Sequence, residues 1–299
     1  MSFSNILTFV DSRSETHREI ERAEWLASVF DADIELFDCE YDQFLESERA
    51  RSNVVADRRK ALAEMAERLS LTDNRTPTVD VSWNSAADEA ILEKVSETHP
   101  DIVIKDTHYH SLLRRTILTN DDWNLILHCA SPLMLAKDRQ LPSRPTVIAA
   151  VDPIHAHDKP ATLDRRILHF AKTLCERSDA ELRTVHVFDT AAHTAAAATP
   201  MGQVAASFSV RSSMLATDAL RTEAMNAFDA LLAEEGIDSA RAEFREGNVA
   251  AGLIDCADEL NADIVVMGAV SRGRMESALV GHTAQQVLDR IGCDLVVVK

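Results

Sequence analysis

Glycine, serine and arginine residues near the C-terminus have the types and spacing that suit a phosphate site. A β-branched run, Ile264–Met267, predicts a buried strand that ends at Gly268, and a second glycine, Gly281, precedes a helical pattern at 284–291. Glycines at such a junction let the backbone approach a ligand, and the first N–H groups of a helix have no partner within it. We therefore predict a strand, a glycine loop and a helix start that can hold a phosphate.

The spacing resembles the ATP-binding signature of the universal stress protein family, which is Gly, two residues, Gly, nine residues, Gly, then Ser or Thr. In this chain the positions hold Gly268, Ser271 and Gly281, followed by His282 and Thr283. Ser271 thus replaces the middle glycine and His282 the hydroxyl residue. The resemblance implies ATP as the cofactor, with Mg²⁺ as a companion ion. The alternative, that the glycines only end a strand and begin a helix beside an empty site, stays open.

The resemblance also implies which residues would touch the nucleotide. The set is Asp152, Val187, Gly268, Ser271, Arg272, Gly273, Gly281, His282 and Thr283. Asp152 is expected near the adenine or ribose and Val187 against the base, whereas the others line the phosphates. Arg272 would supply positive charge for the phosphates in an otherwise acidic chain. Asp152 could equally cap a turn after its strand, and His282 could occupy a surface helix start.

Strand and helix patterns alternate along the chain, and the same order occurs twice. The first half has expected strands at 6–10, 34–37, 79–83, 102–105 and 133–136, with helices at 14–29, 50–69, 86–98 and 123–128. The second half has expected strands at 146–151, 182–188, 240–245, 264–267 and 295–298, with helices at 161–177, 214–235, 249–260 and 284–291. Residues 101–137 align with 263–299 without a gap, at an offset of 263 − 101 = 162. We interpret the chain as a duplicated domain rather than a solenoid, whose repeats are much shorter.

This alternation predicts an α/β fold, in which a mostly parallel sheet carries helices on both faces. We expect domains at 1–138 and 146–299, joined by a linker at 139–145 that contains Pro142 and Pro145. The resemblance implies two tandem Rossmann-like domains of the adenine nucleotide alpha hydrolase-like type. Each would be a five-stranded parallel sheet of order 3-2-1-4-5. The last strands, 133–136 and 295–298, would pair across a pseudo-twofold axis to make a pseudo-dimer inside one chain.

Composition excludes several classes of partner. The formal net charge of −18 repels phosphodiester backbones, so we expect no binding of nucleic acid. No apolar stretch approaches the ~18 residues that span a bilayer, and the N-terminus has no basic segment of a signal peptide, so we expect no membrane insertion. The five cysteines form no CxxC pair and are typical of a reducing compartment. We expect a cytoplasmic protein.

The first half lacks the glycines of the second. At the offset of 162, the positions of Gly268, Ser271, Gly281, His282 and Thr283 hold Asp106, Tyr109, Thr119, Asn120 and Asp121. Asp106 and Asp121 would place carboxylates where phosphates sit, and like charges repel. We therefore predict that the first half does not bind ATP in this manner.

Metal binding and catalysis have weaker support in the sequence. The pairs His108/His110 and His155/His157 each follow a strand, and Asp106 or Asp158 could add an oxygen ligand, but no third His or Cys is fixed by spacing. We therefore expect no metal site. No GxSxG, GxxxxGK[ST] or HExxH motif is present, and no general base lies beside the glycine loop in sequence. Steady turnover of ATP has no support.

These observations leave three hypotheses for function. The first is a non-enzymatic, ATP-binding stress-response regulator, in which ATP orders residues 190–209 and 271–281 and so alters a surface that a protein partner binds. The second is a scaffold whose sites are empty or which holds a lipid-like metabolite in the first half, near Trp83, Tyr109 and Trp123. The third is a slow ATPase or nucleotidyl transferase. The sequence leaves open whether the chain also forms a homodimer.

Overall fold

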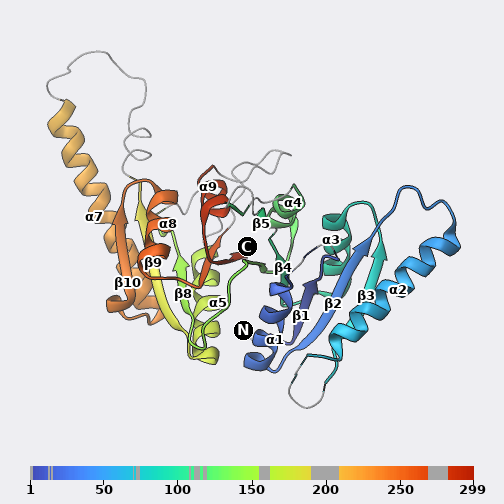
Figure 1. Cartoon of the computed structure of the whole chain (residues 1–299). Helices are drawn as coiled ribbons and strands as arrows, with labels where there is room; N and C mark the ends of the chain where they lie inside the picture. The colour runs from blue at the N-terminus through green and yellow to red at the C-terminus, as the bar shows by residue number, and fades with distance from the viewer. Residues whose placement is uncertain are drawn as a thin grey trace.

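The structure, a computed structural model, is built around one twisted sheet that both halves of the chain share (Figure 1). It describes residues 3–12, 14, 16–69, 71, 75–107, 109–110, 115–116, 120–154, 162–189, 209–268 and 282–299. The two halves lie side by side, each with its strands in the middle and helices on either side. The predicted α/β fold class is therefore confirmed.

The elements follow the predicted order in both halves. The first half contains β1 Asn5–Phe9, α1 Arg18–Phe30, β2 Asp33–Glu40, α2 Glu48–Ala66, β3 Thr78–Trp83, α3 Ala87–Thr98, β4 Ile102–Asp106, β5 Tyr109–His110, β6 Arg115–Thr116, α4 Asn120–His128 and β7 Leu133–Ala136. The second half contains β8 Thr146–Ala150, α5 Leu163–Ser178, β9 Glu181–Phe188, α7 Ser209–Glu235, a short 3-10 helix η2 Ser239–Arg241, β10 Ala242–Glu246, α8 Val249–Glu259, β11 Ile264–Gly268, α9 His282–Arg290 and β12 Asp294–Val298. The sequence did not predict the two-residue strands β5 and β6, which pair with each other outside the main sheet.

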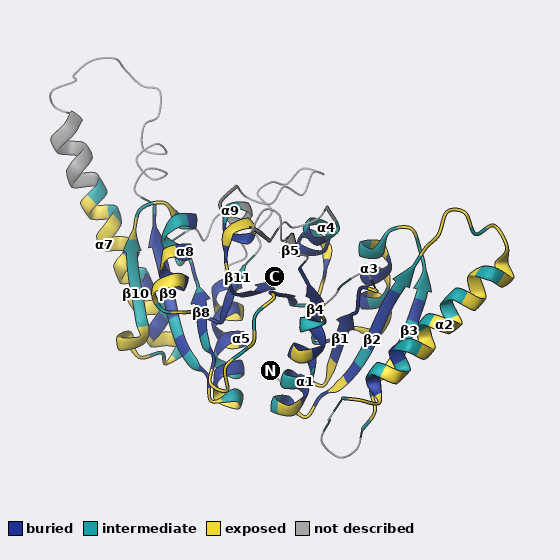
Figure 2. Cartoon of the chain, viewed as in Figure 1, coloured by how far each residue is buried: buried dark blue, intermediate teal, exposed yellow. Residues whose placement is uncertain are grey.

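The ten strands of the main sheet have the order β10-β9-β8-β11-β12-β7-β4-β1-β2-β3. Each half thus has the order 3-2-1-4-5, and all neighbours within a half are parallel. The halves join where β12 pairs with β7 in antiparallel fashion, with Val296 opposite Met134. The expected pairing of the two last strands inside one chain is therefore confirmed. The inner strands are apolar on both faces because helices cover both (Figure 2).

Two apolar cores fill the space between the sheet and its helices. One core contains buried side chains of α1, α2, α5 and α7, and the other contains those of α3, α4, α8 and α9. The first core continues across the boundary between the halves, since the ring of Phe3 lies 5.2 Å from that of Phe170 and 4.4 Å from that of Phe30. Each core therefore stabilises both halves together.

Equivalent helices of the two halves end with the same backbone conformation. Asp31 after α1 and Asp179 after α5 are left-handed, with φ of 58° and 54°. His99 after α3 and Asn261 after α8 are left-handed as well, with φ of 47° and 49°. Few residues other than glycine adopt this conformation. Its recurrence at matching positions fits a duplicated domain.

Buried ionic contacts hold the segment between the halves. Arg22 on α1 is paired with Asp294 on β12, Nε to Oδ2 at 2.6 Å, and their side chains are 1% and 0% exposed. The backbone N–H of Lys137 donates to the same carboxylate at 2.8 Å. Arg139, in the expected linker, pairs with Asp263 at 2.7 Å. The connection between the halves is thus bonded to both of them, although the expected domain limits at 138 and 146 remain a prediction.

Candidate functional site

The candidate site lies at the carboxyl edge of the second half, where the crevice of a doubly wound sheet is expected. Here β8 is the first strand, with β9 on one side and β11 on the other. A small cleft of about 70 Å³ opens between β8, β9 and the first turns of α8. Its walls include Val151, Val185, Val187, Val249 and Leu253, and Asp152 and Asp189 stand at its polar rim. The structure thus brings together Asp152 and Val187, two of the predicted residues.

Val187 is held in place by a close approach of α8 to β9. Its side chain is 7% exposed, and a Cβ added at Gly252 would lie 2.9 Å from Val187 Cγ1. Only a glycine at that position lets the helix approach the strand so closely. The apolar wall on which a flat ring could lie is therefore formed by packing and does not depend on a ligand.

Asp152 is fixed through its backbone. Its N–H donates to Asp164 Oδ1 on α5 at 3.1 Å. This contact orients the turn that follows β8, so a side chain at position 152 is presented at the mouth of the cleft. The carboxylate that caps this turn is therefore that of Asp164, and a capping role for the side chain of Asp152 itself stays a prediction.

In both halves a side chain donates a hydrogen bond to the backbone carbonyl of the residue that directly follows the first strand, Val151 or Val10. In the second half His186 Nδ1 lies 3.0 Å from the carbonyl oxygen of Val151, and since a carbonyl only accepts, Nδ1 carries the proton. In the first half Arg58 donates to the carbonyl of Val10 at 3.3 Å and also pairs with Asp38. Burial raises the pKa of Asp38 to about 6, although Arg58 opposes this shift.

Sequence reasoning missed His186, which is 1% exposed on the opposite face of β9 from Val185 and Val187 and packs on Phe244 with ring centroids 5.5 Å apart. Its signal in the sequence was a histidine between two valines of a strand, at 185 and 187. Such a residue is unusual because buried polar groups need partners.

Gly268 has a structural role that the sequence did not reveal. A Cβ at this position would lie 2.6 Å from Leu163 Cδ2, in the first turn of α5. A larger residue there would force the side chain of Leu163 to move, so the close packing of α5 on the end of β11 favours a glycine whether or not a phosphate lies beyond it. Gly268 ends β11 at the same carboxyl edge as Asp152 and Val187.

The remaining predicted residues belong to the glycine loop. Ser271, Arg272, Gly273 and Gly281 lie outside the described residues. His282 and Thr283 form the first turn of α9, which begins two residues before the expected helical pattern. The N–H groups of this turn point away from the helix at the carboxyl edge, as a helix N-terminus requires. The N-terminus of α9, which directly follows the glycine loop, is therefore suited to bind an anion.

The first half fills the corresponding space with its own charges. Lys105 and Asp122 are at the positions of Met267 and Ala284 by the offset of 162. Lys105 Nζ lies 2.8 Å from Asp122 Oδ1, with side chains 4% and 0% exposed. Burial by itself would lower the pKa of Lys105, but the neighbouring carboxylates, Asp122 first, outweigh it and raise this pKa above the ordinary value. The predicted carboxylate of Asp106 is present, and Asp122 makes the ion pair.

A second group of charges surrounds Asp106. Ser14 Oγ donates to Asp106 Oδ2 at 2.6 Å, and His17 Nδ1 lies 2.9 Å from Glu19 Oε1. Burial raises the pKa of Glu19, and the charge of Asp106 adds to the shift. In the second half the first turn of α5 presents Leu163 to Gly268 instead. Carboxylates therefore occupy the edge of the first half, which makes it a poor place for phosphates.

The structure does not bring together Trp83 and Trp123, two of the aromatic residues that were expected to lie near a lipid-like ligand in the first half. Trp83 lies on the outermost strand β3, whereas Trp123 on α4 packs against a core. Among the described residues, no three His, Cys, Asp or Glu side chains are placed to hold a metal ion. His108, His155 and His157 lie outside the described residues, and only the backbone of His110 is described.

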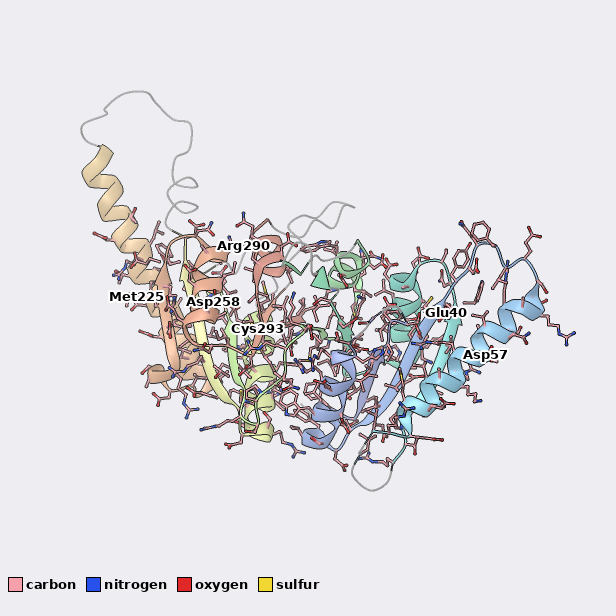
Figure 3. All side chains as sticks on the ribbon, viewed as in Figure 1. Glu40, Asp57, Met225, Asp258, Arg290 and Cys293 are labelled. Carbon is pink, nitrogen blue, oxygen red and sulfur yellow. The ribbon has the colours of Figure 1, made fainter. Side chains whose placement is uncertain are left out.

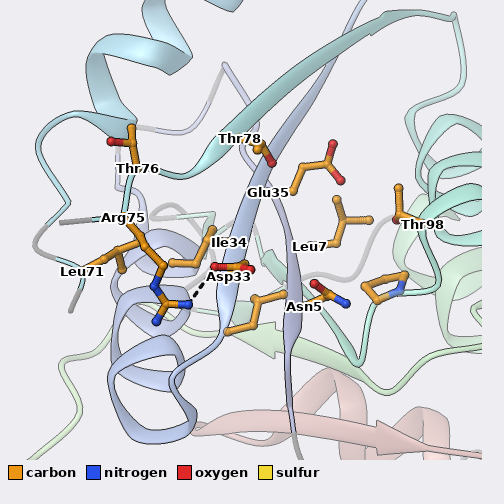
Figure 4. A pocket seen from close by; sticks show the side chains of 12 residues that line it. Asn5, Leu7, Asp33, Ile34, Glu35, Leu71, Arg75, Thr76, Thr78 and Thr98 are labelled. Atoms are coloured by element: carbon orange, nitrogen blue, oxygen red, sulfur yellow. Dashed lines mark hydrogen bonds and ion pairs between the residues drawn. The ribbon is translucent and has the colours of Figure 1, made fainter. Parts of the chain in front are cut away.

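A larger pocket, of about 460 Å³, lies at the opposite edge of the sheet, around the amino ends of β1, β2 and β3 (Figure 4). Its charged side chains already have partners, since Arg75 pairs with Asp33 at 2.8 Å and Glu35 with Lys94 at 2.7 Å. Ligands of parallel α/β sheets bind at the carboxyl ends of strands. We therefore prefer the smaller cleft as the functional site.

This arrangement defines a tandem Rossmann-like α/β protein whose two halves differ at the edge where ligands bind. The chain belongs to the universal stress protein family, whose sequence model matches residues 2–137 and again 151–299. Within the described residues, no helix is both long enough and apolar enough to cross a membrane.

Similar proteins of known name span nearly the whole chain. Universal stress protein E of Escherichia coli K12 is 28% identical, over 99% of this chain and 94% of its own length. A homolog of that protein in Haemophilus influenzae is 24% identical, over 100% and 98%. A functionally unknown protein of Pseudomonas aeruginosa has a similar structure, with a TM-score of 0.75 and 21% identity, over 99% of this chain and 92% of that one. A universal stress protein of Archaeoglobus fulgidus gives 0.64 and 14%, over 98% of each chain.

Proposed function

We propose that this chain is a non-enzymatic stress-response regulator that binds ATP in its second half alone. The observation that supports this most is the contrast between the two carboxyl edges. The second half has an apolar cleft beside Asp152 and a helix start at His282. Where the second half has Met267 and Ala284 beside that helix start, the first half has the buried pair Lys105–Asp122. An anionic ligand is favoured only by the edge of the second half.

In this proposal the adenine lies on Val187 and the ribose near Asp152. The phosphates extend toward the start of α9, where backbone N–H groups and the hydroxyl of Thr283 donate hydrogen bonds to them, and Arg272 and a Mg²⁺ ion balance their charge. Ser271, Gly273 and Gly281 would allow the backbone to approach the phosphates. Because the described edge offers no paired base and nucleophile, we propose binding without turnover.

Binding or release of ATP would then change the surface that a protein partner contacts. In this proposal the nucleotide contacts β8, β9, α8 and α9, so its binding free energy stabilises the arrangement of these elements in which all four reach the ligand. The segments expected to respond are 190–209 and 271–281, of which residues 190–208 and 271–281 lie outside the described residues. The five cysteines form no disulfide, in keeping with a reducing compartment such as the cytoplasm.

A bulky side chain at the rim of the cleft tests the position of the base. Val249→Trp should weaken ATP binding at least about tenfold, because the added indole occupies a cleft of about 70 Å³. Val249 is only half-buried, so the fold should tolerate the change. The measurement is the Kd for a fluorescent ATP analogue by anisotropy.

The duplicated chain provides a matched control. Ala87 begins α3 as Val249 begins α8, at the offset of 162, and it is half-buried as well. Ala87→Trp should leave the Kd unchanged. Equal affinity in wild type and Val249→Trp, or equal losses in both variants, would show that the base does not bind in this cleft.

A further inference from the structure

Two of the three large apolar side chains that the described residues expose lie in one short connection. Tyr41 is 52% and Phe44 82% exposed, and both belong to the segment between β2 and α2; the third, Met225, is 36% exposed on α7. This connection lies at the outer end of the first half, beyond Glu40 (Figure 3), far from the nucleotide cleft between β8 and β9. Exposed aromatic groups that gather in this way mark interaction sites more often than scattered single residues do.

The rings of Tyr41, Phe44 and Trp83 line the same groove. Tyr41 and Trp83 lie with ring centroids 5.9 Å apart. Together with Phe44, Leu45 and Val54 they line an open groove of about 540 Å³. A groove of this size is large enough for a side chain or two of a bound segment. We call this surface, Tyr41, Phe44, Leu45, Val54 and Trp83, the aromatic groove.

Hydrogen bonds hold the connection in the shape that exposes Phe44. The N–H of Phe44 donates to Asp42 Oδ1 at 2.8 Å, and the N–H of Leu45 donates to the carbonyl of Asp42 at 3.2 Å. Arg51 Nε donates to the carbonyl of Leu45 at 2.7 Å. A turn that is ordered in this way presents the ring of Phe44 at little entropic cost on binding.

The charges beside the groove favour a cationic partner. Residues 40–48 carry the carboxylates of Glu40, Asp42, Glu46 and Glu48 and no basic residue, and of these Glu40 already lies 3.7 Å from Arg58 on α2. Arg49 and Arg51 follow on α2, but Arg51 already lies over the Trp83 ring, with its guanidinium carbon 5.7 Å from the ring centroid. That contact shows that the indole accepts a guanidinium, and the free rings of Tyr41 and Phe44 can accept others.

We infer that the aromatic groove docks a basic segment of a partner protein, with one aromatic or aliphatic anchor flanked by Lys or Arg. The anchor fills the groove and the cations meet the carboxylates of residues 40–48. An anionic membrane would be repelled by the same carboxylates. A second copy of this chain, with its net charge of −18, would be repelled as well. The inference does not depend on nucleotide binding.

Fluorescence anisotropy with short synthetic peptides tests this inference. The probe is a fluorescein-labelled peptide with Phe and Leu flanked by Lys and Arg, and its controls replace either the cations by Glu or the apolar pair by Ser. Wild type should bind the probe and neither control. Phe44→Ser should weaken binding at least about tenfold, as expected for an anchor contact. Glu46→Lys should weaken it less, and chiefly at low salt.

Met225→Ser is the matched control, because Met225 is also exposed but lies on α7 in the other half (Figure 3). It should bind the probe as wild type does. Phe44 is so exposed that its replacement should leave the thermal midpoint unchanged, and this is measured alongside. The inference is wrong if wild type does not bind the probe or if Phe44→Ser binds it equally well. It is also wrong if Phe44 is instead required for binding phosphatidylglycerol vesicles or for self-association in sedimentation.

Discussion

Replacing Arg22 with methionine should lower the free energy of unfolding by about 3–5 kcal/mol, the usual cost of leaving one member of a buried ion pair alone. Asp294 is fully buried, and Arg22 is its only cationic partner at hydrogen-bond distance among the described residues. Burial raises the pKa of Asp294, and the loss of Arg22 would remove the strongest opposing charge. Urea denaturation followed by circular dichroism measures the change.

Two variants separate the ion pair from general damage. Arg22→Met with Asp294→Asn should recover more than half of the loss, because the amide keeps an acceptor for the N–H of Lys137 without a buried charge. Arg18→Met should cost less than about 1 kcal/mol, because the partners of Arg18, Glu21 and Asp138, are exposed to solvent. If Arg22→Met costs no more than Arg18→Met, the pair does not hold the halves together.

Lys105→Met should destabilise the protein by a similar amount, about 3–5 kcal/mol, for the same reason. It leaves the buried carboxylate of Asp122 without the ammonium group that lies 2.8 Å away. The replacement has a natural counterpart, since the second half carries Met267 at the equivalent position. The volume of the side chain is therefore nearly preserved, and the change in stability reports charge rather than packing.

The second half of the chain also suggests a second substitution that should restore the lost stability. Lys105→Met with Asp122→Ala copies Met267 and Ala284 into the first half and should restore most of the stability. Urea midpoints of wild type, both single variants and the double variant form a double-mutant cycle. A double variant that is no more stable than Lys105→Met would mean that Asp122 is needed for another reason, such as the start of α4.

The sequence predicted the architecture because burial on both faces leaves a simple pattern. Ile102 to Ile104, Leu133 to Ala136 and Ile264 to Val266 are continuous apolar runs, and each is an inner strand in the structure. The alignment of 101–137 with 263–299 without a gap, together with the repeated order of strands and helices, then predicted that the two halves would share a fold. The prediction that β7 pairs with β12 came from the resemblance to the family and not from the residues.

The polar interior could not be predicted in the same way. Arg22 and Asp294 are 272 residues apart, and each alone is typical of a solvated surface position. The comparison of the halves predicted carboxylates at the first edge from Asp106 and Asp121, but the ion pair uses Asp122. Which of two adjacent carboxylates faces inward depends on how α4 packs, and the sequence does not determine this. His186 was missed because one polar residue in a strand can equally face solvent.

We propose that one half of the chain binds ATP and the other does not. Isothermal titration of ATP with Mg²⁺ tests it most directly, in wild type, in Gly281→Asp and in Thr119→Asp, which places the same carboxylate at the equivalent position of the first half. We predict one nucleotide per chain in wild type and Thr119→Asp, and no detectable heat of binding in Gly281→Asp. No binding in wild type, or unchanged binding in Gly281→Asp, would contradict the claim.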